Sequence, residues 1–375
     1  MGSGLANFAS YLRFLSVPPT RRRIVIYSEG AASWPHLGPV LEALLQCFEG
    51  EMAYVSSSAE DPGIKLDHPN LHRHVIGDAA VRTIFFSGLQ ADLVLMTMPD
   101  LHTFHIKRST KVKCYAYLHH SLVSSHMAYR AGAFDHFDAL LCAGPHHEAE
   151  LRAREAKSGL AAKLLLRHGY GRLDAILSAA DADLRSSQHP TLLVAPSWGA
   201  NGLIEAHSET LLAGLENCTW QVVVRPHPQT LKLAPHAVDR VRMWCSKQPS
   251  QRILETGVAG HESLRRADVM LSDWSGAAFD YALGLERPVL FVDVPRKINN
   301  PDYESIGLAP IEVFGREQIG RVIATRDLAN LKPHLDGLRA DLAARVVAIR
   351  AFRERWVYNV GRSAEAGAKA LLQLL

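Results

Sequence analysis

The sequence predicts an α/β protein made of two doubly wound domains, and three observations support this fold class. Short apolar segments typical of buried strands alternate with helix-like segments along most of the chain. This alternation breaks once, near residues 175–190, and then restarts. The chain has 375 residues, enough for two to three domains at roughly 150 residues each. Apolar strands separated by helices indicate a parallel sheet that is covered on both faces.

The amino-acid composition is that of an ordinary globular protein. Hydrophobic residues make up 47% and charged residues 21% of the chain, which excludes a disordered or collagen-like protein. The formal net charge of +3 is too small to suggest nucleic acid as a partner. The five cysteines include no CxxC pair, which favours a reducing compartment and no zinc knuckle.

No part of the sequence indicates export or membrane insertion. No apolar run reaches the roughly 18 residues that a membrane span needs. The N-terminus also lacks the charged start, apolar core and cleavage site of a secretory signal. We therefore expect a cytoplasmic protein, either soluble or peripheral on a membrane.

Residues 1–20 are predicted to form an amphipathic N-terminal arm. Its apolar side chains recur at spacings of three and four residues, at Leu5, Phe8, Leu12 and Leu15. Residues 21–23 are all arginine. An apolar face beside a basic cluster can lie on an anionic membrane surface, so residues 1–23 are a candidate membrane contact. The same pattern also fits a terminal helix packed on its own domain, and both interpretations stay open.

The first domain is predicted to span residues 21–185. Strands are expected at residues 23–27, 52–55, 92–97, 113–118 and 139–143. Helices are expected at residues 36–48 and from about residue 145. A turn-rich segment at residues 169–174 and a polar stretch at residues 186–190 close this domain.

The second domain is predicted to span residues 186–345. Strands are expected at residues 191–195, 221–225, 269–272 and 289–292, and helices near residues 203–216, 276–285 and 316–325. The stretch from residue 335 to the end has a helical pattern, and residues 346–375 are predicted to cross back to the first domain. Ligands of open α/β sheets bind at the carboxyl ends of strands, so we expect the site in a crevice between the domains.

Two polar side chains stand at the end of one predicted strand. Arg225 and His227 alternate with two prolines directly after an apolar segment. A guanidinium group suits phosphate oxygens, and an imidazole can donate a hydrogen bond or move a proton near neutral pH. The alternative is a structural turn with a solvated arginine.

A second polar segment follows the strand at residues 269–272. Ser272 and Asp273 end the strand, and Ser275, Gly276 and Ala277 open a helix. Free N–H groups and the helix dipole make such an N-terminus an anion site. Ser275 or Asp273 could instead cap the helix with no ligand present. Two strand-end sites in one domain favour a ligand that carries phosphate.

The first domain offers His120 after the strand at residues 113–118. Adjacent side chains point in different directions, so at most one of His119 and His120 is expected to enter a site. Neither has cysteine or carboxylate neighbours at ligand spacing, so no metal site is predicted. Residues 181–183 read Asp-Ala-Asp, like a metal-binding DxD, but they do not end a strand.

Taken in order, these segments resemble the CDP-glycerol glycerophosphotransferase family, the teichoic-acid polymerases and primases with relatives that build capsules. The resemblance spans about residues 110–295. It is carried by His120 and by the residues at positions 169–174, 195–198, 225–228 and 272–281, followed by Arg-Pro-Val at positions 287–289.

The resemblance implies a GT-B fold, in which two Rossmann-like domains face an interdomain cleft and the C-terminal domain binds the donor nucleotide. It implies transfer of a polyol phosphate, such as glycerol phosphate, from a CDP-activated donor to an acceptor hydroxyl, with release of CMP. The acceptor would be a cell-surface polymer or a lipid-linked molecule in capsule or teichoic-acid-like synthesis. The donor is a substrate, and no cofactor or metal is expected. Members are typically peripheral on the inner face of the cell membrane.

The resemblance also implies roles for individual residues. His120 and His227 match the family's catalytic histidines. Ser275 and Asp273 match its phosphate-binding serine and aspartate. The predicted donor-binding set is completed by Ser197, Arg225, Ser272, Gly276, Ala277 and Asp280.

Three other functions remain open from the sequence. A GT-B glycosyltransferase would use the same diphosphate site but attack a sugar carbon instead of phosphorus. A nucleotide-sugar epimerase shares a related scaffold and needs no acceptor. A nucleotide-binding module of a larger capsule assembly would bind the donor without turnover.

Overall fold

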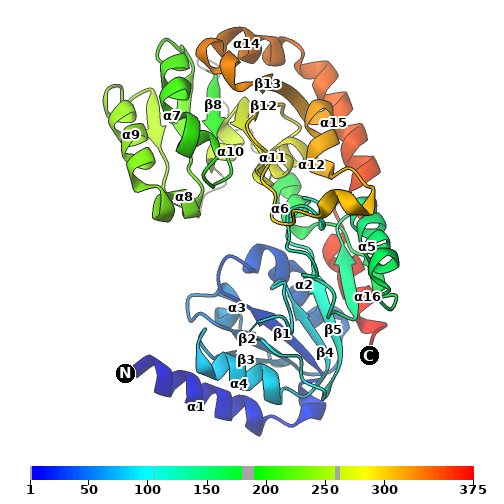
Figure 1. Cartoon of the computed structure of the whole chain (residues 1–375). Helices are drawn as coiled ribbons and strands as arrows, with labels where there is room; N and C mark the ends of the chain where they lie inside the picture. Colours follow the sequence, from blue (N-terminus) through cyan, green and yellow to red (C-terminus); the bar gives the residue numbers. More distant parts are fainter. Residues whose placement is uncertain (1, 105, 180–189, 258–261) are drawn as a thin grey trace. The chain divides into compact units, whose positions relative to one another are not determined.

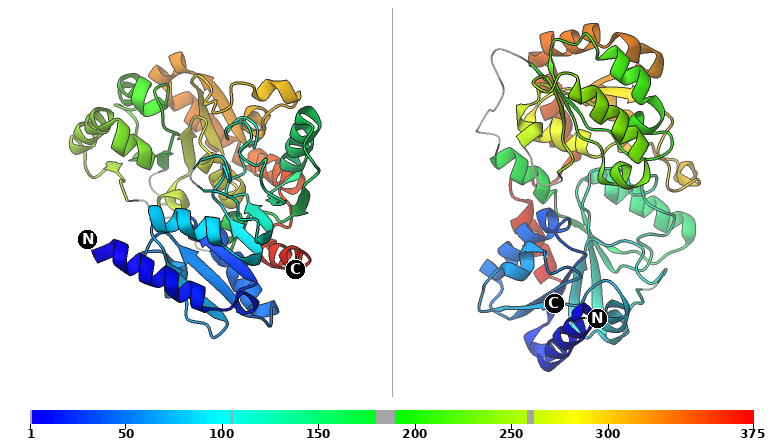
Figure 2. Two further views of the ribbon diagram at one scale, coloured as in Figure 1. Left: turned by 60° about the horizontal axis from the view of Figure 1, so that its bottom comes forward. Right: turned by 90° about the vertical axis from the view of Figure 1, so that its left-hand side faces the viewer.

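The structure, a computed structural model, describes residues 2–104, 106–179, 190–257 and 262–375 (Figure 1). The chain forms two compact units. Unit 1 comprises residues 1–174, 300–308 and 357–375, and unit 2 comprises residues 175–299 and 309–356. Both termini therefore belong to unit 1 (Figure 2). The expected boundary at residue 185, most of the polar stretch and the Asp-Ala-Asp segment lie outside the described residues.

Unit 1 is built on a seven-stranded parallel sheet in the order β3-β2-β1-β4-β5-β6-β7. The strands are β1 (Ile24–Ser28), β2 (Met52–Ser56), β3 (Leu71–Val75), β4 (Ala91–Met96), β5 (Val112–Leu118), β6 (Ala139–Cys142) and β7 (Leu164–Arg167). The helices are α1 (Gly2–Ser16), α2 (Trp34–Cys47), α3 (Pro62–Lys65), α4 (Ala80–Gly88), α5 (Pro145–Ser158), α6 (Gly171–Ser178, which runs into unit 2) and α16 (Ser363–Leu372), with 3-10 turns η1 (Pro19–Arg21) and η2 (Tyr303–Ile306).

Both faces of this sheet are covered. In β1, Ile24 and Ile26 enter the core beneath α2 and α16, whereas Val25 and Tyr27 enter the core beneath α1, α4 and α5. Because every residue of β1 is buried, the strand is a continuous apolar run in the sequence, as parallel strands commonly are. The C-terminal helix α16 packs on α2, which confirms that the end of the chain returns to the first domain.

Unit 2 is built on a six-stranded parallel sheet in the order β10-β9-β8-β11-β12-β13. The strands are β8 (Thr191–Val194), β9 (Gln221–Val224), β10 (Arg252–Leu254), β11 (Val269–Ser272), β12 (Val289–Asp293) and β13 (Gly320–Ala324). The helices are α7 (Leu203–Gly214), α8 (Pro228–Leu233), α9 (Pro235–Ser246), α10 (Glu262–Arg266), α11 (Ala277–Leu285), α12 (Ile311–Phe314), α13 (Arg316–Ile319), α14 (Lys332–Ala340) and α15 (Leu342–Trp356), with a 3-10 turn η3 (Thr325–Asn330).

Helix α15 belongs to unit 2 through its whole length. Its Phe352 ring lies 6.2 Å from the ring of Phe279 in α11, and Arg353 donates a hydrogen bond to the carbonyl of Leu283. The chain leaves unit 2 only after Trp356. The sequence analysis had placed a division eleven residues earlier, after residue 345, within what is one helix.

Two predicted elements differ from the structure. Residues 316–325 were predicted as a helix, but α13 ends at Ile319 and residues 320–324 form the strand β13. The reason is that Gly320 pairs with Val289 of β12, at an approach so close that a Cβ would lie 2.0 Å from the Val289 carbonyl oxygen. The segment 169–174, predicted as a turn, already contains the start of α6 at Gly171.

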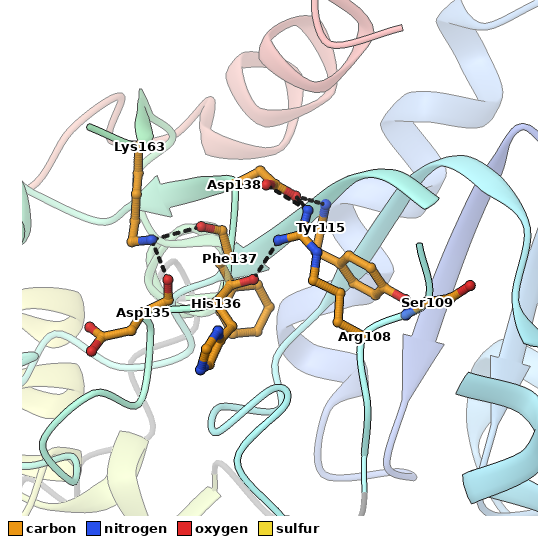
Figure 3. Close-up of polar contacts among 8 residues, drawn as sticks. All are labelled: Arg108, Ser109, Tyr115, Asp135, His136, Phe137, Asp138 and Lys163. Atoms are coloured by element: carbon orange, nitrogen blue, oxygen red, sulfur yellow. Dashed lines mark hydrogen bonds and ion pairs between the residues drawn. The ribbon is translucent and has the colours of Figure 1, made fainter. Parts of the chain in front are cut away.

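A polar cluster fixes the amino ends of β6 and β7 (Figure 3). Arg108 donates two hydrogen bonds of 2.7 Å to the carboxylate of Asp138, which also accepts from the backbone N–H of Tyr115. Lys163 donates to the carbonyls of Asp135 and Phe137. This cluster lies at the opposite ends of the strands from His120, so its role is structural.

Helix α1 lies along α4 and the edge strand β3 at the outside of unit 1 (Figures 1 and 2). Tyr11 and Phe14 face inward and are buried, and Phe14 packs on Phe85. The four apolar residues singled out in the sequence face outward, with exposed fractions of 75% for Leu5, 45% for Phe8, 51% for Leu12 and 44% for Leu15. None of the helices in the described part of the chain has both the length and the apolar character of a membrane span.

The three arginines after α1 have structural partners. Arg22 is buried, stacks on Phe14 at 4.2 Å and donates hydrogen bonds to the carbonyls of Val17 and Gln90. Arg21 pairs with Glu51, and Arg23 pairs with Asp92. The basic cluster therefore anchors the end of α1 to the domain, and the arginines do not form an uncompensated basic patch.

Candidate functional site

The strand order of unit 2 reverses between β8 and β11, which is the position where open α/β sheets bind ligands. Ser197 follows β8, and Ser272 and Asp273 end and follow β11. The structure brings these three predicted residues together. The Ser272 hydroxyl donates to the carbonyl of Ala195 at 2.8 Å, and the Asp273 carboxylate accepts from the backbone N–H of Ser197 at 2.6 Å.

Asp273 is a positioning residue in this geometry. Its side chain is fully buried, and its second oxygen accepts from the N–H of Leu203 at 3.3 Å, at the start of α7. Both carboxylate oxygens are thus used to hold the loop 197–203. Ser272 is also fully buried. The two buried side chains bind backbone groups of the segment that follows β8, and their predicted contact with the donor phosphate stays a prediction.

The predicted anion site lies at the start of α11. Ser275, Gly276 and Ala277 are partly exposed there, and the Ser275 hydroxyl accepts from the N–H of Ala277 at 3.3 Å. Backbone N–H groups at the first turn of a helix attract anions. Asp280 lies one turn further along and is buried.

Arg225 and His227 follow β9, the strand next to β8. Arg225 is partly exposed, and its backbone N–H donates to the carbonyl of Val194. Nδ1 of His227 accepts from the N–H of Gln229 at 3.1 Å, so the neutral ring carries its proton on Nε2. Burial, with the charge of Lys297 as the second cause, lowers the pKa of His227 to about 4. At neutral pH His227 is therefore a hydrogen-bond donor through Nε2.

A cavity of about 260 Å³ opens at this edge of the sheet. It is lined by the loop 197–202, by Trp274 and by the segment 294–299 that follows β12. Sequence analysis missed Lys297 in that segment, whose ammonium lies 3.9 Å from the ring centre of Trp198. The signal was present, because Asp-Val-Pro-Arg-Lys comes directly after the strand predicted at residues 289–292.

In unit 1, His120 follows β5 within a group of aromatic rings. Its ring lies 5.8 Å from that of His36 and 6.1 Å from that of Tyr129. The Tyr170 hydroxyl donates to the backbone carbonyl of His120 at 3.3 Å. The neighbouring His119 is buried, with Nδ1 3.0 Å from the carbonyl oxygen of Leu141. His120 is thus the partly exposed member of the pair.

The hydrogen bonds of Tyr117 bear on the chemistry of His120. The Tyr117 hydroxyl lies 3.1 Å from Nδ1 of His120 and also shares a hydrogen bond with Tyr129. A phenol has one proton to donate. When Tyr117 donates it to Tyr129, it accepts from Nδ1–H of His120, and Nε2 then carries the lone pair that a general base needs. Burial, followed by the charge of His147, lowers the pKa of His120 to about 4.

A second cavity of about 260 Å³ lies within unit 1, between α5 and the segment 300–306. It is lined by His126 and Glu150, whose side chains approach to 3.3 Å, and by the ion pair of Arg154 with Asp135. None of the predicted site residues lines it. Among the described residues, no three His, Cys, Asp or Glu side chains are placed to hold a metal ion.

Comparison with known proteins gives structural matches only. No protein-family model and no curated protein sequence matches the chain. A variant of the wall teichoic acid polymerase TagF superimposes with a TM-score of 0.59 at 14% identity, covering 98% of this chain and 97% of that one.

Two other kinds of structure match as well. A putative UDP-N-acetylglucosamine 2-epimerase from Listeria monocytogenes has a TM-score of 0.59 at 15% identity, covering 92% and 94% of the two chains. OtsA has a TM-score of 0.57 at 10% identity, covering 94% and 99%. At these identities the likeness extends to the fold alone. The two parallel sheets, each in Rossmann-like order, and the matches to TagF, the epimerase and OtsA show that this chain has the GT-B fold.

Proposed function

We propose that this protein transfers a polyol phosphate from a CDP-activated donor to an acceptor hydroxyl and releases CMP. The observation that carries the proposal is the edge of unit 2 at β8, β9 and β11. There Asp273 holds the loop after β8 beside the start of α11, and Arg225 and His227 follow the next strand. A guanidinium, an imidazole N–H and the backbone amides of a helix N-terminus are groups that bind a diphosphate.

The order of motifs supports this choice of donor, because it resembles that of the CDP-glycerol glycerophosphotransferases from His120 to the end of β12. A TagF variant soaked with CDPG is among the structures that share the fold, at 14% identity and a TM-score of 0.57. We expect the acceptor to be a cell-surface polymer or a lipid-linked molecule in capsule or teichoic-acid-like synthesis.

In the proposed reaction, the acceptor oxygen attacks the phosphorus that carries the polyol. Nε2 of His120 takes the proton of the attacking hydroxyl, which requires the neutral imidazole that its burial favours. A new oxygen–phosphorus bond forms, the bond to the bridging oxygen breaks, and CMP leaves. Arg225, the Nε2–H of His227 and the amides at Ser275–Ala277 stabilise the negative charge on the diphosphate.

A nucleotide-sugar epimerase is the second candidate, because the Listeria epimerase structure matches as well as TagF does, with the same TM-score. An epimerase would interconvert a UDP-sugar without any acceptor. A donor panel separates the two functions: the proposed transferase releases CMP from CDP-glycerol or CDP-ribitol, whereas an epimerase changes UDP-N-acetylglucosamine and ignores CDP-polyols.

The test is CMP release with a primed acceptor, measured for the wild type and for His120→Ala and His227→Ala. Each variant is expected to lose about 10²–10⁴-fold in kcat/KM. The exposed His236 provides the matched control, and His236→Ala should keep the wild-type rate. No metal or cofactor is expected to be required, so EDTA should not slow the reaction. Wild-type rates in both site variants would reject the assignment.

We also propose that the protein works at a membrane surface, on the inner face of the cell membrane. The outward face of α1 supports this location, because Leu5, Phe8, Leu12 and Leu15 are exposed side by side along it. The helix contains no acidic residue, and the exposed Arg13 flanks this face. The apolar stripe carries this proposal, since the arginines at positions 21–23 have partners within the domain.

A further inference from the structure

Lys297 lies at the same sheet edge as the predicted donor site. It belongs to the segment 294–299, which follows β12 and lines the 260 Å³ cavity opposite the loop 197–202. Its ammonium sits over the ring of Trp198 at 3.9 Å. The ring of Trp198 in turn lies 6.0 Å from the ring of His227. Trp198 therefore links Lys297 to His227, which the proposed function places at the donor diphosphate.

The ammonium of Lys297 lacks an anionic partner in the described part of the chain. No carboxylate there lies within 4.0 Å of it, and it donates no hydrogen bond to a described residue. Lys297 is nevertheless partly buried. Burial lowers its pKa, and the more distant carboxylates of Asp273 and Glu205 oppose this shift. A partly desolvated cation with three unused N–H donors gains most from an anion that enters the cavity.

The wall of the cavity is held rigidly. The Trp274 indole N–H donates to the carbonyl of Val294 at 2.9 Å, which ties the segment containing Lys297 to the end of β11. The guanidinium of Arg316 stacks on Trp274 at 3.5 Å and pairs with Asp293 at 2.8 Å. A site whose walls are fixed before the ligand arrives loses little ordering entropy on binding.

The chemistry of the lining selects for phosphate. Lys297 is a compact point charge, which suits phosphate oxygens. The opposite wall, residues 199–202, reads Gly-Ala-Asn-Gly and leads into α7, a helix of 12 residues. Small residues allow a phosphate to approach the backbone closely. Two carboxylates hold this loop: Asp273 accepts from the backbone N–H groups of Ser197 and Leu203, and Glu205 accepts from the N–H of Gly199 at 3.4 Å.

We propose that Lys297 binds the diphosphate of the nucleotide-activated donor in the cavity between residues 197–202 and 294–299. This assignment rests on the proposed function, because it takes a nucleoside diphosphate derivative as the ligand. It adds a cation that follows β12 to the set that follows β9 and β11. Free phosphate or pyrophosphate offers the same oxygens, and the experiment separates these sources.

The test is isothermal titration of the full chain with CDP, UDP, pyrophosphate and inorganic phosphate. Lys297→Met is expected to weaken CDP binding by about 10–100-fold, and Lys297→Arg, which keeps the charge, by less than the methionine variant. The control Lys247→Met removes an equal charge from an exposed position in the same unit and should bind like the wild type. Lys297→Met should melt at or above the wild-type temperature, because it removes a partly desolvated cation.

Each result has a defined meaning. CDP binding that is equal in the wild type and Lys297→Met overturns the role of Lys297 and leaves the proposed function intact. Pyrophosphate binding that depends on Lys297, without binding of CDP or UDP, supports the phosphate site and contradicts a nucleotide-activated donor. A wild type that binds none of the four probes overturns both. Loss of binding in Lys247→Met as large as in Lys297→Met would assign the effect to net charge alone.

Discussion

At the scale of single residues, the same residue type has different roles depending on what surrounds it. His119 and His120 are adjacent, yet the first is buried against the carbonyl of Leu141 and the ring of His147, and the second is partly exposed among tyrosines. The sequence could predict that they diverge. It could not predict which partners each would have, because His36 and Tyr170, which contact His120, come from distant segments.

The contacts of Asp273 could not be predicted from the sequence either. Its position after a strand could be predicted from the sequence, but the direction of its carboxylate depends on the loop 197–203. Lys297 was overlooked for a related reason: its contact with Trp198 joins two loops that are about 100 residues apart in the sequence. Strand ends can be predicted from a sequence, but contacts between the loops that follow them cannot.

We predict that Asp273→Asn destabilises unit 2 by about 2–3 kcal/mol. The amide keeps one acceptor oxygen and turns an N–H₂ toward a backbone N–H, which leaves a buried donor unsatisfied. Urea unfolding followed by tryptophan fluorescence measures this, because five of the six tryptophans lie in unit 2. The matched change Asp336→Asn, in an exposed pair with Lys332, should cost less than about 1 kcal/mol. Wild-type stability with lost nucleotide binding would instead make Asp273 a direct ligand contact.

The pKa of His120 predicts the acid limb of activity. Since burial lowers this pKa to about 4, the neutral base persists above that pH and is lost only as the pH falls through about 4. We expect kcat/KM to stay level from pH 7.5 down to about 5 and to fall below that. The measurement is a pH profile of CMP release, taken over the range in which the chain remains folded. An acid limb centred near 6.5, the ordinary value for histidine, would contradict a base whose pKa is lowered by its surroundings.

At the scale of elements, the sequence predicted the inner strands and missed the edges. The four strands that it did not predict, β3, β7, β10 and β13, are the two edges of each sheet. An inner strand such as β1 is buried on both faces and is continuously apolar. An edge strand is partly exposed and carries charge, as in Leu-His-Arg-His-Val for β3 and Gly-Arg-Val-Ile-Ala for β13. The apolar pattern that identifies buried parallel strands is therefore interrupted in β3 and β13, whereas the edge strand β7, which reads Leu-Leu-Leu-Arg, is apolar and was not predicted.

Helix α1 packs on its own domain and also keeps an exposed apolar face, so it has features of both interpretations of its sequence. Tyr11 and Phe14 pack it on unit 1, while the stripe at Leu5, Phe8, Leu12 and Leu15 remains outside. Counting apolar residues could not separate these faces, because the inward pair and the outward stripe are interleaved at helical spacing. The anchoring role of Arg22 was also hidden in the sequence, where it is one of three consecutive arginines.

We predict that the double variant Phe8→Ser, Leu12→Ser lowers partitioning onto phosphatidylcholine–phosphatidylglycerol vesicles by about tenfold or more, because each apolar side chain contributes roughly 1.5–3 kcal/mol when fully buried. Both side chains are about half exposed, at 45% and 51%, so the fold should remain stable. Flotation measures the effect. Leu164→Ser, which changes a 54% exposed leucine on β7 of the same unit, should float like the wild type. Equal flotation of the double variant would rule out α1 as the contact.

At the scale of the whole molecule, the two units differ in how they respond to acid. Unit 1 contains a set of histidines whose pKa values burial lowers: His36, His119, His120, His146, His147 and His168. In unit 2, His227 has a shift of this kind. Neutral imidazoles can pack against carbonyls and aromatic rings inside a protein, but protonating such a buried ring lowers the stability of the unit.

The expected outcome is that unit 1 loses stability first on acidification. A histidine with a lowered pKa binds its proton more readily in the unfolded chain, so its contribution is complete above about pH 6.5 and is lost as the pH falls from there toward 4. For His120 and His168, with pKa values of about 4, the loss at pH 5 is about 2 kcal/mol each. Glu29 and Asp100, whose pKa values burial raises, oppose this trend only in part.

Hydrogen exchange measured by mass spectrometry at pH 7.5 and 5.0, corrected for the intrinsic exchange rate, resolves the two units. Protection in β1, β5 and β6 should fall by several orders of magnitude relative to β8 and β11. The variant His168→Gln should reduce the number of protons that unit 1 takes up on unfolding by about one. The exposed His236→Gln in unit 2 should leave that number unchanged. Equal losses in both units, or a gain in unit 1 at pH 5, would mean that its histidines are protonated in the folded state and that the neutral base assigned to His120 is wrong.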